Sequence, residues 1–600
     1  MSRLFVRAIV RLAAPLGPIL ALFIVGTTSS QYWRYVLSEI ITAMLVGTAL
    51  VMLVGFARCI TLASGAVMAL GAYCATLLIT KLGCPYIPAV LAGTVFGAVG
   101  GLALAIPSVR FRGHNLAMVT LVFQSVVIIV LREWKSLTGG AEGMKVPPPN
   151  VFGMEISGDL GQLVLTVIGA VIALPLLTML LLGPFGKNLR SLAGNEIGAR
   201  AFGISVEEHL IAAFVISSAI LAFAAILSAP QSRILDPDSF GLFASIAALA
   251  YPIVGGMGSL WGGLIGGAAM RALPELLRPV ADYAELVLSA IVLAVILLAP
   301  GGLVALCQGM FGQRRRAADD VRTEPIETPL ASVAVGRDAV DASPVSALSI
   351  HNVSVAYDAL RAVDDTSLTV PAGTIYGVMG PNGAGKTTLF NLISGFIAPS
   401  SGRIYFFGAP LLAAAAHHRI ALGISRTFQH VAIFPQLTCR DNVVIGLGAN
   451  RIGMVLARSF NAAIAGTTSR RETASAERAL EAVGLGHYCA APAGSLSLGD
   501  QRRLEIARAI VSKPRLILLD EPVSGLTNDE VAQIGALLRR INRELGVTIL
   551  IVEHNIGFLL DVCDQLSVMG QGRVVAEGSP DRVVATPEVR RIYFGESRVE

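Results

Sequence analysis

The first half of the chain carries a series of apolar stretches, and these limit the possible folds more than any other feature. A helix rises about 1.5 Å per residue and must cross roughly 30 Å of hydrocarbon, so a membrane span needs about 20 apolar residues. Stretches near that length occur at residues 10–28, 37–57, 62–82, 86–106, 115–132, 160–183, 210–229, 240–256, 260–277 and 282–304. The part 240–277 can also be one span with a re-entrant piece. We predict a multi-span α-helical membrane domain of about ten spans over residues 1–311.

Composition and charge agree with this membrane half. Hydrophobic residues make up 54% of the chain and charged residues only 14%, a lower charged share than soluble domains have. Arginines 3, 7, 11 and 314–316 flank the apolar half, as cytoplasmic flanks do. The net charge of +5 is modest and gives no reason to expect a nucleic-acid partner. The seven cysteines include no C-x-x-C pair, so we expect neither a disulfide framework nor a zinc site.

Small residues recur every four positions in two of the apolar stretches. They are Gly93 with Gly97, and Gly258 with Gly262 and Gly266. Such spacing lets helices approach closely, so we predict packing seams there. No charged residue is clearly central in any predicted span, which argues against a proton-driven carrier.

Polar side chains inside spans are candidates for a solute path, because each is expensive in hydrocarbon and usually faces protein or water. Gln124 and Ser125 lie in the middle of the stretch 115–132, and Thr61 and Ser64 begin the third span. Hydrogen bonding between helices is the other reading of these residues, and the sequence leaves both open.

Residues 186–204, between the sixth and seventh spans, predict a short amphipathic helix. Leu189, Leu192, Ala193 and Ile197 share one helical face, with polar residues opposite. Such a helix can lie on the membrane surface or dock in a groove of another domain.

A phosphate-binding pattern dominates the second half. Residues 380–388 fit the P-loop spacing G-x-x-x-x-G-K-[ST], after a strand-like run at 374–379 and before a helix beginning near 389. Backbone N–H groups of such a loop converge on phosphate, and the following helix N-terminus adds positive potential. We predict that the nucleotide is bound by Gly380, Pro381, Asn382, Gly383, Ala384, Gly385, Lys386, Thr387 and Thr388. Lys386 would reach the β- and γ-phosphates and Thr387 would ligate Mg²⁺.

Two domains and a tether follow from these patterns. Residues 312–347 lack periodicity and large apolar clusters, so we predict a flexible linker with a typical reach of roughly 30–35 Å. Residues 348–600 are expected to form a soluble α/β domain.

Six segments of the membrane half, in order, resemble the permease subunit of branched-chain amino acid ABC importers over about residues 35–305. They are residues 110–113 (RFRG), 136–140 (SLTGG), 186–204, 236–240 (DPDSF), 255–262 (GGMGSLWG) and 273–277 (LPELL). The resemblance implies that residues 186–204 are the coupling helix that seats on an ATPase. Cys59 and Ser64 stand where that family carries Gln and His, so the solute stays open.

Residues 348–598 are similar to the ATPase subunit of the same importer family. The resemblance implies that Tyr357 stacks on adenine and that Gln429 contacts Mg²⁺ or water in the Q-loop. It also implies that Ser497 and Gly499, in the signature loop 496–501, face the γ-phosphate held by a second ATPase. His554 matches the switch histidine, and residues 524–527 match the D-loop.

An apolar strand at 516–519 ends in two carboxylates. Asp520 can hold Mg²⁺ through water next to Thr387, and Glu521 can orient or deprotonate the attacking water. His554 can stabilise charge on the γ-phosphate. Asp500 departs from the usual signature sequence and adds negative charge near the nucleotide.

The sequence therefore predicts an ATP-driven importer subunit in the bacterial cytoplasmic (inner) membrane. An N-terminal membrane domain is fused to a C-terminal P-loop ABC ATPase with a helical subdomain on the cytoplasmic side, which uses ATP and Mg²⁺. The resemblance implies as partners a second permease, a second ABC ATPase and an extracytoplasmic solute-binding protein, besides solute and lipid. Branched-chain amino acids are the expected solutes. The alternatives are an importer of amides, urea or aromatic acids, an ABC exporter, or an ATP-gated channel.

Overall fold

The chain folds into two compact units in a computed structural model that describes residues 12–278, 283–299, 301–310, 346–357, 360–411, 416–448, 452–465 and 470–594. The helical unit comprises Met1–Leu189, Val206–Asp319 and Val455–Thr467. The α/β unit comprises Arg190–Ser205, Asp320–Met454 and Thr468–Glu600. Arginines 3, 7, 11 and 314–316 and nearly all of the predicted linker 312–347 lie outside the described residues. The domain boundaries at 311 and 348 therefore stay predictions.

Two short segments group with the unit that the sequence did not assign to them. Residues 190–205, from the predicted permease, belong to the α/β unit, and residues 455–467, from the predicted ATPase, belong to the helical unit. In the helical unit, Ser459 of α19 (Ile452–Ala465) is fully buried, and its Oγ accepts a hydrogen bond from the N–H of Phe185 at 3.1 Å. The second segment is thus held at the start of α9 (Pro184–Gly194).

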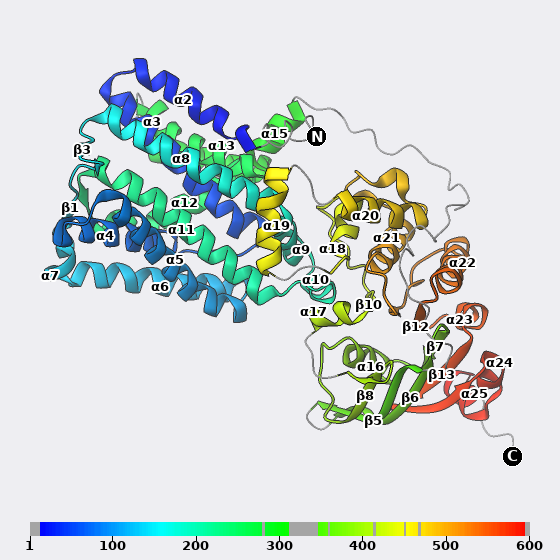
Figure 1. Cartoon of the computed structure of the whole chain (residues 1–600). Coiled ribbons are helices and arrows are strands. Elements are labelled where there is room, and N and C mark those ends of the chain that lie inside the picture. Colours follow the sequence, from blue (N-terminus) through cyan, green and yellow to red (C-terminus); the bar gives the residue numbers. More distant parts are fainter. Residues whose placement is uncertain are drawn as a thin grey trace. The chain divides into compact units, whose positions relative to one another are not determined.

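The helical unit contains a helix at each of the ten predicted stretches (Figure 1). They are α2 (Leu16–Thr28), α3 (Gln31–Leu50), α4 (Ser64–Leu82), α5 (Tyr86–Arg110), α6 (Gly113–Glu133), α8 (Asp159–Leu182), α11 (Val206–Ser232), α12 (Leu242–Gly255), α13 (Leu260–Leu276) and α14 (Ala284–Leu298). Within the described residues, seven helical segments are long and apolar enough to cross a membrane. The shorter ones are α2, α13 and α14, with 13, 17 and 15 residues.

Glycine seams hold the helices of this unit close together. A Cβ on Gly267 of α13 would lie 2.2 Å from the carbonyl oxygen of Ala43 on α3. A Cβ on Gly97 of α5 would lie 2.2 Å from the Cβ of Ala222 on α11, and one on Gly266 would lie 1.8 Å from the carbonyl oxygen of Tyr251 on α12. No side chain fits at these distances, so the predicted packing role is confirmed for Gly97 and Gly266. A Cβ on Gly258 would meet nothing within 4 Å, so the predicted seam does not extend to Gly258.

An ion pair continues the seam between α3 and α13. Glu39 lies one turn before Ala43, and Arg271 lies one turn after Gly267. Their Oε2 and Nε atoms are 3.5 Å apart, and the side chains are 21% and 29% exposed. A charge inside an apolar bundle needs such a partner. The sequence analysis missed this pair because its members are far apart in the chain.

Gln124 forms hydrogen bonds between elements of the helical unit, one of the two readings that the sequence leaves open. The side chain is 1% exposed. Its Oε1 accepts hydrogen bonds from the N–H of Ala66 at 2.6 Å and from the hydroxyl of Ser245 at 3.1 Å. The Ser245 Oγ accepts in turn from the N–H of Gly65 at 2.9 Å. These side chains satisfy free N–H groups at the start of α4, as a cap does, so the interhelical reading is confirmed for Gln124.

The other three candidates for a solute path are Ser125, Thr61 and Ser64. Ser125 is exposed and donates to the carbonyl oxygen of Leu121 in its own helix at 3.1 Å. Thr61 and Ser64 are buried, with 3% and 2% exposed. A solute-path role for these two residues stays a prediction.

The predicted amphipathic segment 186–204 forms two helices instead of one. Helix α9 ends at Gly194 and α10 (Glu196–Ala201) begins after Asn195, whose Oδ1 accepts from the N–H of Gly198 at 2.7 Å. This N-cap starts a new helix. Leu189 is fully buried, whereas Ile197 is 57% exposed, so the single apolar face that we expected is interrupted.

The α/β unit contains a six-stranded sheet in the order β10-β11-β12-β7-β13-β14. Its strands are β7 (Ile375–Met379), β10 (Ile424–Arg426), β11 (Leu516–Asp520), β12 (Thr548–Val552), β13 (Gln565–Gly570) and β14 (Arg573–Gly578). All neighbours are parallel except β13 and β14. The carboxyl ends of β11, β12 and β7 therefore meet at one edge, where ligands bind in open α/β sheets.

A second, antiparallel sheet and a group of helices complete this unit. The sheet has the order β6-β5-β8-β9, formed by β5 (Ser346–Tyr357), β6 (Leu360–Pro371), β8 (Ser401–Phe406) and β9 (Ala409–Pro410). The helices are α16 (Lys386–Ile393), α18 (Cys439–Ile445), α20 (Arg470–Ala482), α21 (Leu498–Ile510) and α22 (Asn528–Leu545). The predicted fold class, a helical membrane domain with an α/β P-loop domain, is confirmed.

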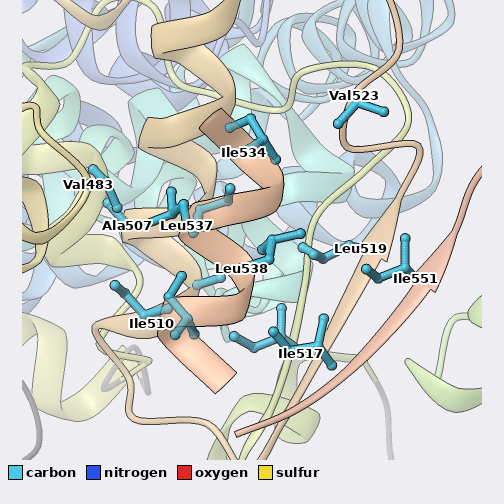
Figure 2. Close-up of a cluster of buried hydrophobic side chains, with 14 of the residues drawn as sticks. Val483, Ala507, Ile510, Ile517, Leu519, Val523, Ile534, Leu537, Leu538 and Ile551 are labelled. Atoms are coloured by element: carbon cyan, nitrogen blue, oxygen red, sulfur yellow. The ribbon is translucent and has the colours of Figure 1, made fainter. Parts of the chain in front are cut away.

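Strand β11 is buried on both faces, which explains its continuous apolar sequence. Ile517 and Leu519 pack with Leu538 of α22 and other helical side chains in one core cluster (Figure 2). Leu516 and Leu518 belong to a second cluster on the other face. The strand end at Asp520 is therefore rigidly placed.

The role of Gln124 predicts a loss of stability on substitution. Gln124→Leu removes the acceptor for the N–H of Ala66 and should lower the free energy of unfolding by about 1–3 kcal/mol. The measurement is the thermal unfolding midpoint of the full chain in detergent. Ser125→Ala is the matched control and should leave the midpoint unchanged. A Gln124→Leu protein as stable as wild type but altered in solute flux would restore the solute-path reading.

Candidate functional site

The loop 380–385 connects β7 to α16, as the sequence predicts. Gly383 and Gly385 adopt positive φ angles of 82° and 98°, which favour glycine. A Cβ on Gly385 would lie 2.3 Å from the carbonyl oxygen of Ala362, and one on Gly380 would lie 2.4 Å from that of Met569. These glycines are required by close backbone approach, and the loop ends at the N-terminus of a helix, where anions bind.

Lys386 folds over the loop that precedes it. Its Nζ donates hydrogen bonds to the carbonyl oxygens of Gly380 at 2.7 Å and Pro381 at 2.9 Å, and the residue is 6% exposed. Burial lowers the pKa of Lys386, while the nearby carboxylates of Glu521 and Asp520 oppose that shift. Of the other predicted loop residues, Asn382 and Thr387 are exposed, Thr388 is partly exposed and Ala384 is buried.

Asp520, the last residue of β11, is 2% exposed and pairs with Arg426 at the end of the neighbouring strand β10. Its Oδ2 accepts from Arg426 Nη2 at 3.1 Å. Nη1 of Arg426 donates to Asn391 Oδ1 at 2.7 Å and Ser394 Oγ at 2.6 Å on the far side. Burial raises the pKa of Asp520, and Arg426 counteracts that rise. The sequence analysis missed Arg426, since strand order decides its position.

Gln429, Glu521 and His554, which the sequence places in three separate segments, meet at one point. Gln429 Nε2 donates to Glu521 Oε2 at 3.1 Å. His554 Nε2 lies 3.3 Å from Glu521 Oε1. Glu521 has a φ of 49°, a left-handed conformation that is unusual for a side-chain-bearing residue and concentrates at functional sites.

Glu553, which the sequence analysis also missed, ties two loops of this site together. The residue is 3% exposed. Its carboxylate accepts from the N–H of Val523 at 3.0 Å, of His554 at 2.7 Å and of Asn555 at 3.2 Å. The loop after β11 is thereby fixed against the loop after β12. The available signal was an acidic residue directly after an apolar strand, as at Asp520.

The signature residues Ser497 and Gly499 lie at the start of α21. Ser497 Oγ accepts from the N–H of Asp500 at 3.2 Å and donates to its Oδ2 at 2.9 Å. Asp500 Oδ1 lies 3.5 Å from Arg503 Nη1, so the added negative charge is paired. A Cβ on Gly499 would lie 2.4 Å from Glu530 Oε1. Among the described residues, no hydrogen bond or ion pair joins Ser497 or Gly499 to the loop 380–388.

Tyr357 is the last residue of β5. Its side chain lies outside the part of the chain that the structure describes. The predicted stacking on adenine therefore stays a prediction.

Two known families match different parts of the chain. Residues 32–300 match the family described as the branched-chain amino acid transport system permease component. Residues 363–524 match the ABC transporter family.

Three curated relatives each match 42% of this chain. The branched-chain amino acid transport ATP-binding protein BraF of Pseudomonas aeruginosa is 33% identical over 250 residues, which are 42% of this chain and 98% of BraF. LivG of Escherichia coli, with the same description, is 33% identical over 258 residues, 42% of this chain and 98% of LivG. The lipopolysaccharide export ATP-binding protein LptB of Haemophilus influenzae is 34% identical over 253 residues, again 42% and 98%.

Among solved structures, a nucleotide-free ATP-binding cassette of an ABC transporter is 30% identical, with a TM-score of 0.37, over 42% of this chain and 100% of that chain. Of the curated relatives BraF, LivG and LptB, 98% of the length is matched by this chain. The chain therefore belongs to the ABC transporter family: it is a membrane protein that joins a permease domain of the branched-chain amino acid type to an ATP-binding, ATP-hydrolysing ABC ATPase domain in one polypeptide.

Proposed function

We propose that this chain drives the uptake of branched-chain or related hydrophobic amino acids across the bacterial cytoplasmic membrane at the expense of ATP. The observation that carries the proposal is the presence, in one chain, of a permease domain of the branched-chain amino acid type and an ATPase similar to BraF and LivG. Concentrating a solute a thousandfold costs about 4 kcal/mol, which a passive pore cannot supply. The ATPase half supplies it.

The ATPase half is also similar to LptB, which belongs to an export system, so its sequence does not indicate the direction of transport. The direction is inferred from the membrane domain. The permease match to an amino acid transport system favours an importer over an exporter. Import of amides, urea or aromatic acids by the same architecture is the alternative solute class, and Cys59 and Ser64 at the start of the third span are the residues that leave it open.

Each catalytic role follows from the geometry of the strand edge. The N–H groups of residues 382–388 and the ammonium of Lys386 bind the phosphates of ATP. Glu521, fixed between Gln429 and His554, takes a proton from the attacking water or orients it. His554 then stabilises the charge on the γ-phosphate. Phosphoryl transfer depends mainly on positioning and electrostatics, and this site offers both.

The oxygen donors near the loop suit Mg²⁺, a hard cation that prefers oxygen ligands. Thr387, Asp520 and Gln429 would hold it. Asp520 Oδ1 makes no hydrogen bond within the described protein, whereas Oδ2 is taken by Arg426. No group of three His, Cys, Asp or Glu side chains in the described residues could hold a metal alone, so the phosphates would complete the coordination. Bound Mg²⁺ neutralises phosphate charge.

Hydrolysis requires partners. Among the described residues, no hydrogen bond or ion pair joins Ser497 or Gly499 to the loop 380–388 of their own chain. We propose that they face the nucleotide of a second ATPase, whose signature loop would complete this site in return. We propose a second permease and a second ABC ATPase, from another copy or a related chain, together with an extracytoplasmic solute-binding protein.

The proposal predicts that Glu521→Gln lowers ATP turnover by about 10²–10⁴-fold, the usual contribution of a general base, while ATP still binds. The measurements are phosphate release and ATP retention by the complete complex, with the second ATPase and second permease present, in liposomes. Glu588→Gln, an exposed residue at the start of α25 (Pro587–Phe594), is the control and should change neither. A variant that keeps solute flux without ATP turnover would indicate a gated channel instead.

The proposed solutes predict that a loaded solute-binding protein raises ATP turnover in liposomes that contain the complete complex. Leucine, isoleucine and valine should stimulate more than acetamide, urea or benzoate, each presented by the binding protein encoded nearest to this chain. Stimulation by amides or aromatic acids alone would assign the alternative solute class. Absence of stimulation by every loaded binding protein would contradict the importer.

A further inference from the structure

A buried arginine lies where the permease segment 190–205 meets the rest of the α/β unit. Arg508 of α21 is 1% exposed. Its guanidinium lies 4.3 Å from the ring centroid of Phe202 and 5.0 Å from that of Phe434. The nitrogens Nε, Nη1 and Nη2 make no hydrogen bond. Two aromatic faces and the carboxylate of Glu505 therefore surround this buried cation.

Phe202 is firmly held at this position. It is fully buried and directly follows α10. A Cβ on Gly198 of α10 would lie 3.2 Å from the carbonyl oxygen of Ala432, so α10 packs closely on the stretch after Gln429. Ser205 is followed directly by α11, one of the candidate membrane spans. Three residues, 203–205, therefore separate Phe202 from this helix.

Glu505 connects Arg508 to a second arginine. Its carboxylate is 1% exposed and lies 3.7 Å from Arg508 Nη2 and 3.2 Å from Arg502 Nη1. It also accepts from the N–H of Ala432 at 2.8 Å. Burial lowers the pKa of Arg508 to about 10, so the arginine remains charged at neutral pH. One carboxylate thus serves two buried cations.

Arg502 holds the backbone of the Q-loop. Its Nη1 donates to the carbonyl oxygen of Phe428 at 2.9 Å, and its Nη2 donates to that of Gln429 at 2.7 Å. The side chain of Gln429 donates to Glu521. Contacts therefore run without a gap from Phe202 to the proposed catalytic base.

We propose that Arg508, Glu505 and Arg502 are positioning residues that pass the position of Phe202 to Gln429 and so to Glu521. The inference rests on the proposed function, since it describes how movement of the membrane helices reaches the ATPase site. If Phe202 withdraws, Arg508 loses one aromatic face and draws more strongly on Glu505. Glu505 then neutralises Arg502 less, and the hydrogen bond from Arg502 to the carbonyl oxygen of Gln429 changes in strength or geometry. In a low-dielectric interior such a redistribution is strong, because water does not screen it.

The first test replaces the ring but keeps an apolar side chain. Phe202→Leu in the full complex should reduce the stimulation of ATP turnover by loaded binding protein at least fivefold and should reduce basal turnover by a smaller factor, while the KM for ATP changes less than twofold. Phe202→Tyr keeps the aromatic face and should retain the stimulation. Phe407→Leu is the matched control, because Phe407 lies 3.4 Å from the guanidinium of Arg515 elsewhere in the same unit. It should leave the stimulation unchanged.

A double-mutant cycle separates a positioning role from mere packing. Arg508 and Glu505 lie between Phe202 and Arg502 in the series of contacts, and substitutions at independent sites add. The inference predicts that Phe202→Leu with Arg502→Met reduces the stimulation no more than one of the single variants does. Additive losses, or basal and stimulated turnover falling together with the unfolding midpoint, would overturn it.

Hydrogen exchange decides the inference independently of transport. The amides of residues 428–434 should exchange faster in Phe202→Leu and in Arg508→Met than in wild type, whereas those of residues 380–388 should not. Unchanged exchange at 428–434 in both variants contradicts the inference. If wild type shows no stimulation by any binding protein, the proposed function fails, and the exchange result still decides whether Phe202 positions Gln429.

Discussion

The cation of Arg508, enclosed by two aromatic rings and one carboxylate, is the interaction on which the rest of the account depends. A buried charge without adequate partners is costly, so this arginine requires Phe202 to stay in place. Phe202 comes from a segment that lies, in sequence, between membrane helices. The α/β unit is therefore built in part from permease residues. Arg508, which contacts Phe202, is connected through Glu505 to Arg502, and Arg502 binds the Q-loop backbone.

At the catalytic edge and in the helical unit, buried polar groups are likewise paired with specific partners. Asp520, Glu521 and Glu553 lie at the carboxyl ends of two adjacent parallel strands. Asp520 binds an arginine, Glu521 contacts a histidine and a glutamine amide, and Glu553 accepts from backbone N–H groups. In the helical unit, Gln124 satisfies the N–H of Ala66, and Glu39 pairs with Arg271. Polar groups in apolar surroundings thus fix particular helices and loops.

Local sequence was enough to predict the phosphate loop, the strand that ends in Asp520 and the glycine seams, because each depends on residues close in the chain. Arg426 escaped detection, since only strand order brings it to the site. Glu553 had a local signal, an acidic residue directly after an apolar strand, that was not used. The pairing of Glu39 with Arg271 and of Gln124 with Ala66 depends on tertiary contacts. The break at Asn195 had a local signal, an N-cap residue, which the amphipathic pattern obscured.

The central claim is that hydrolysis at Glu521 is mechanically tied to movement of solute through the permease half. Its most direct measurement is the number of ATP molecules hydrolysed per solute molecule accumulated, in sealed liposomes with the complete complex and loaded binding protein. The account predicts accumulation above the outside concentration, with a ratio that stays constant as the ATP concentration varies. Solute that only equilibrates, at any rate of ATP consumption, would contradict it.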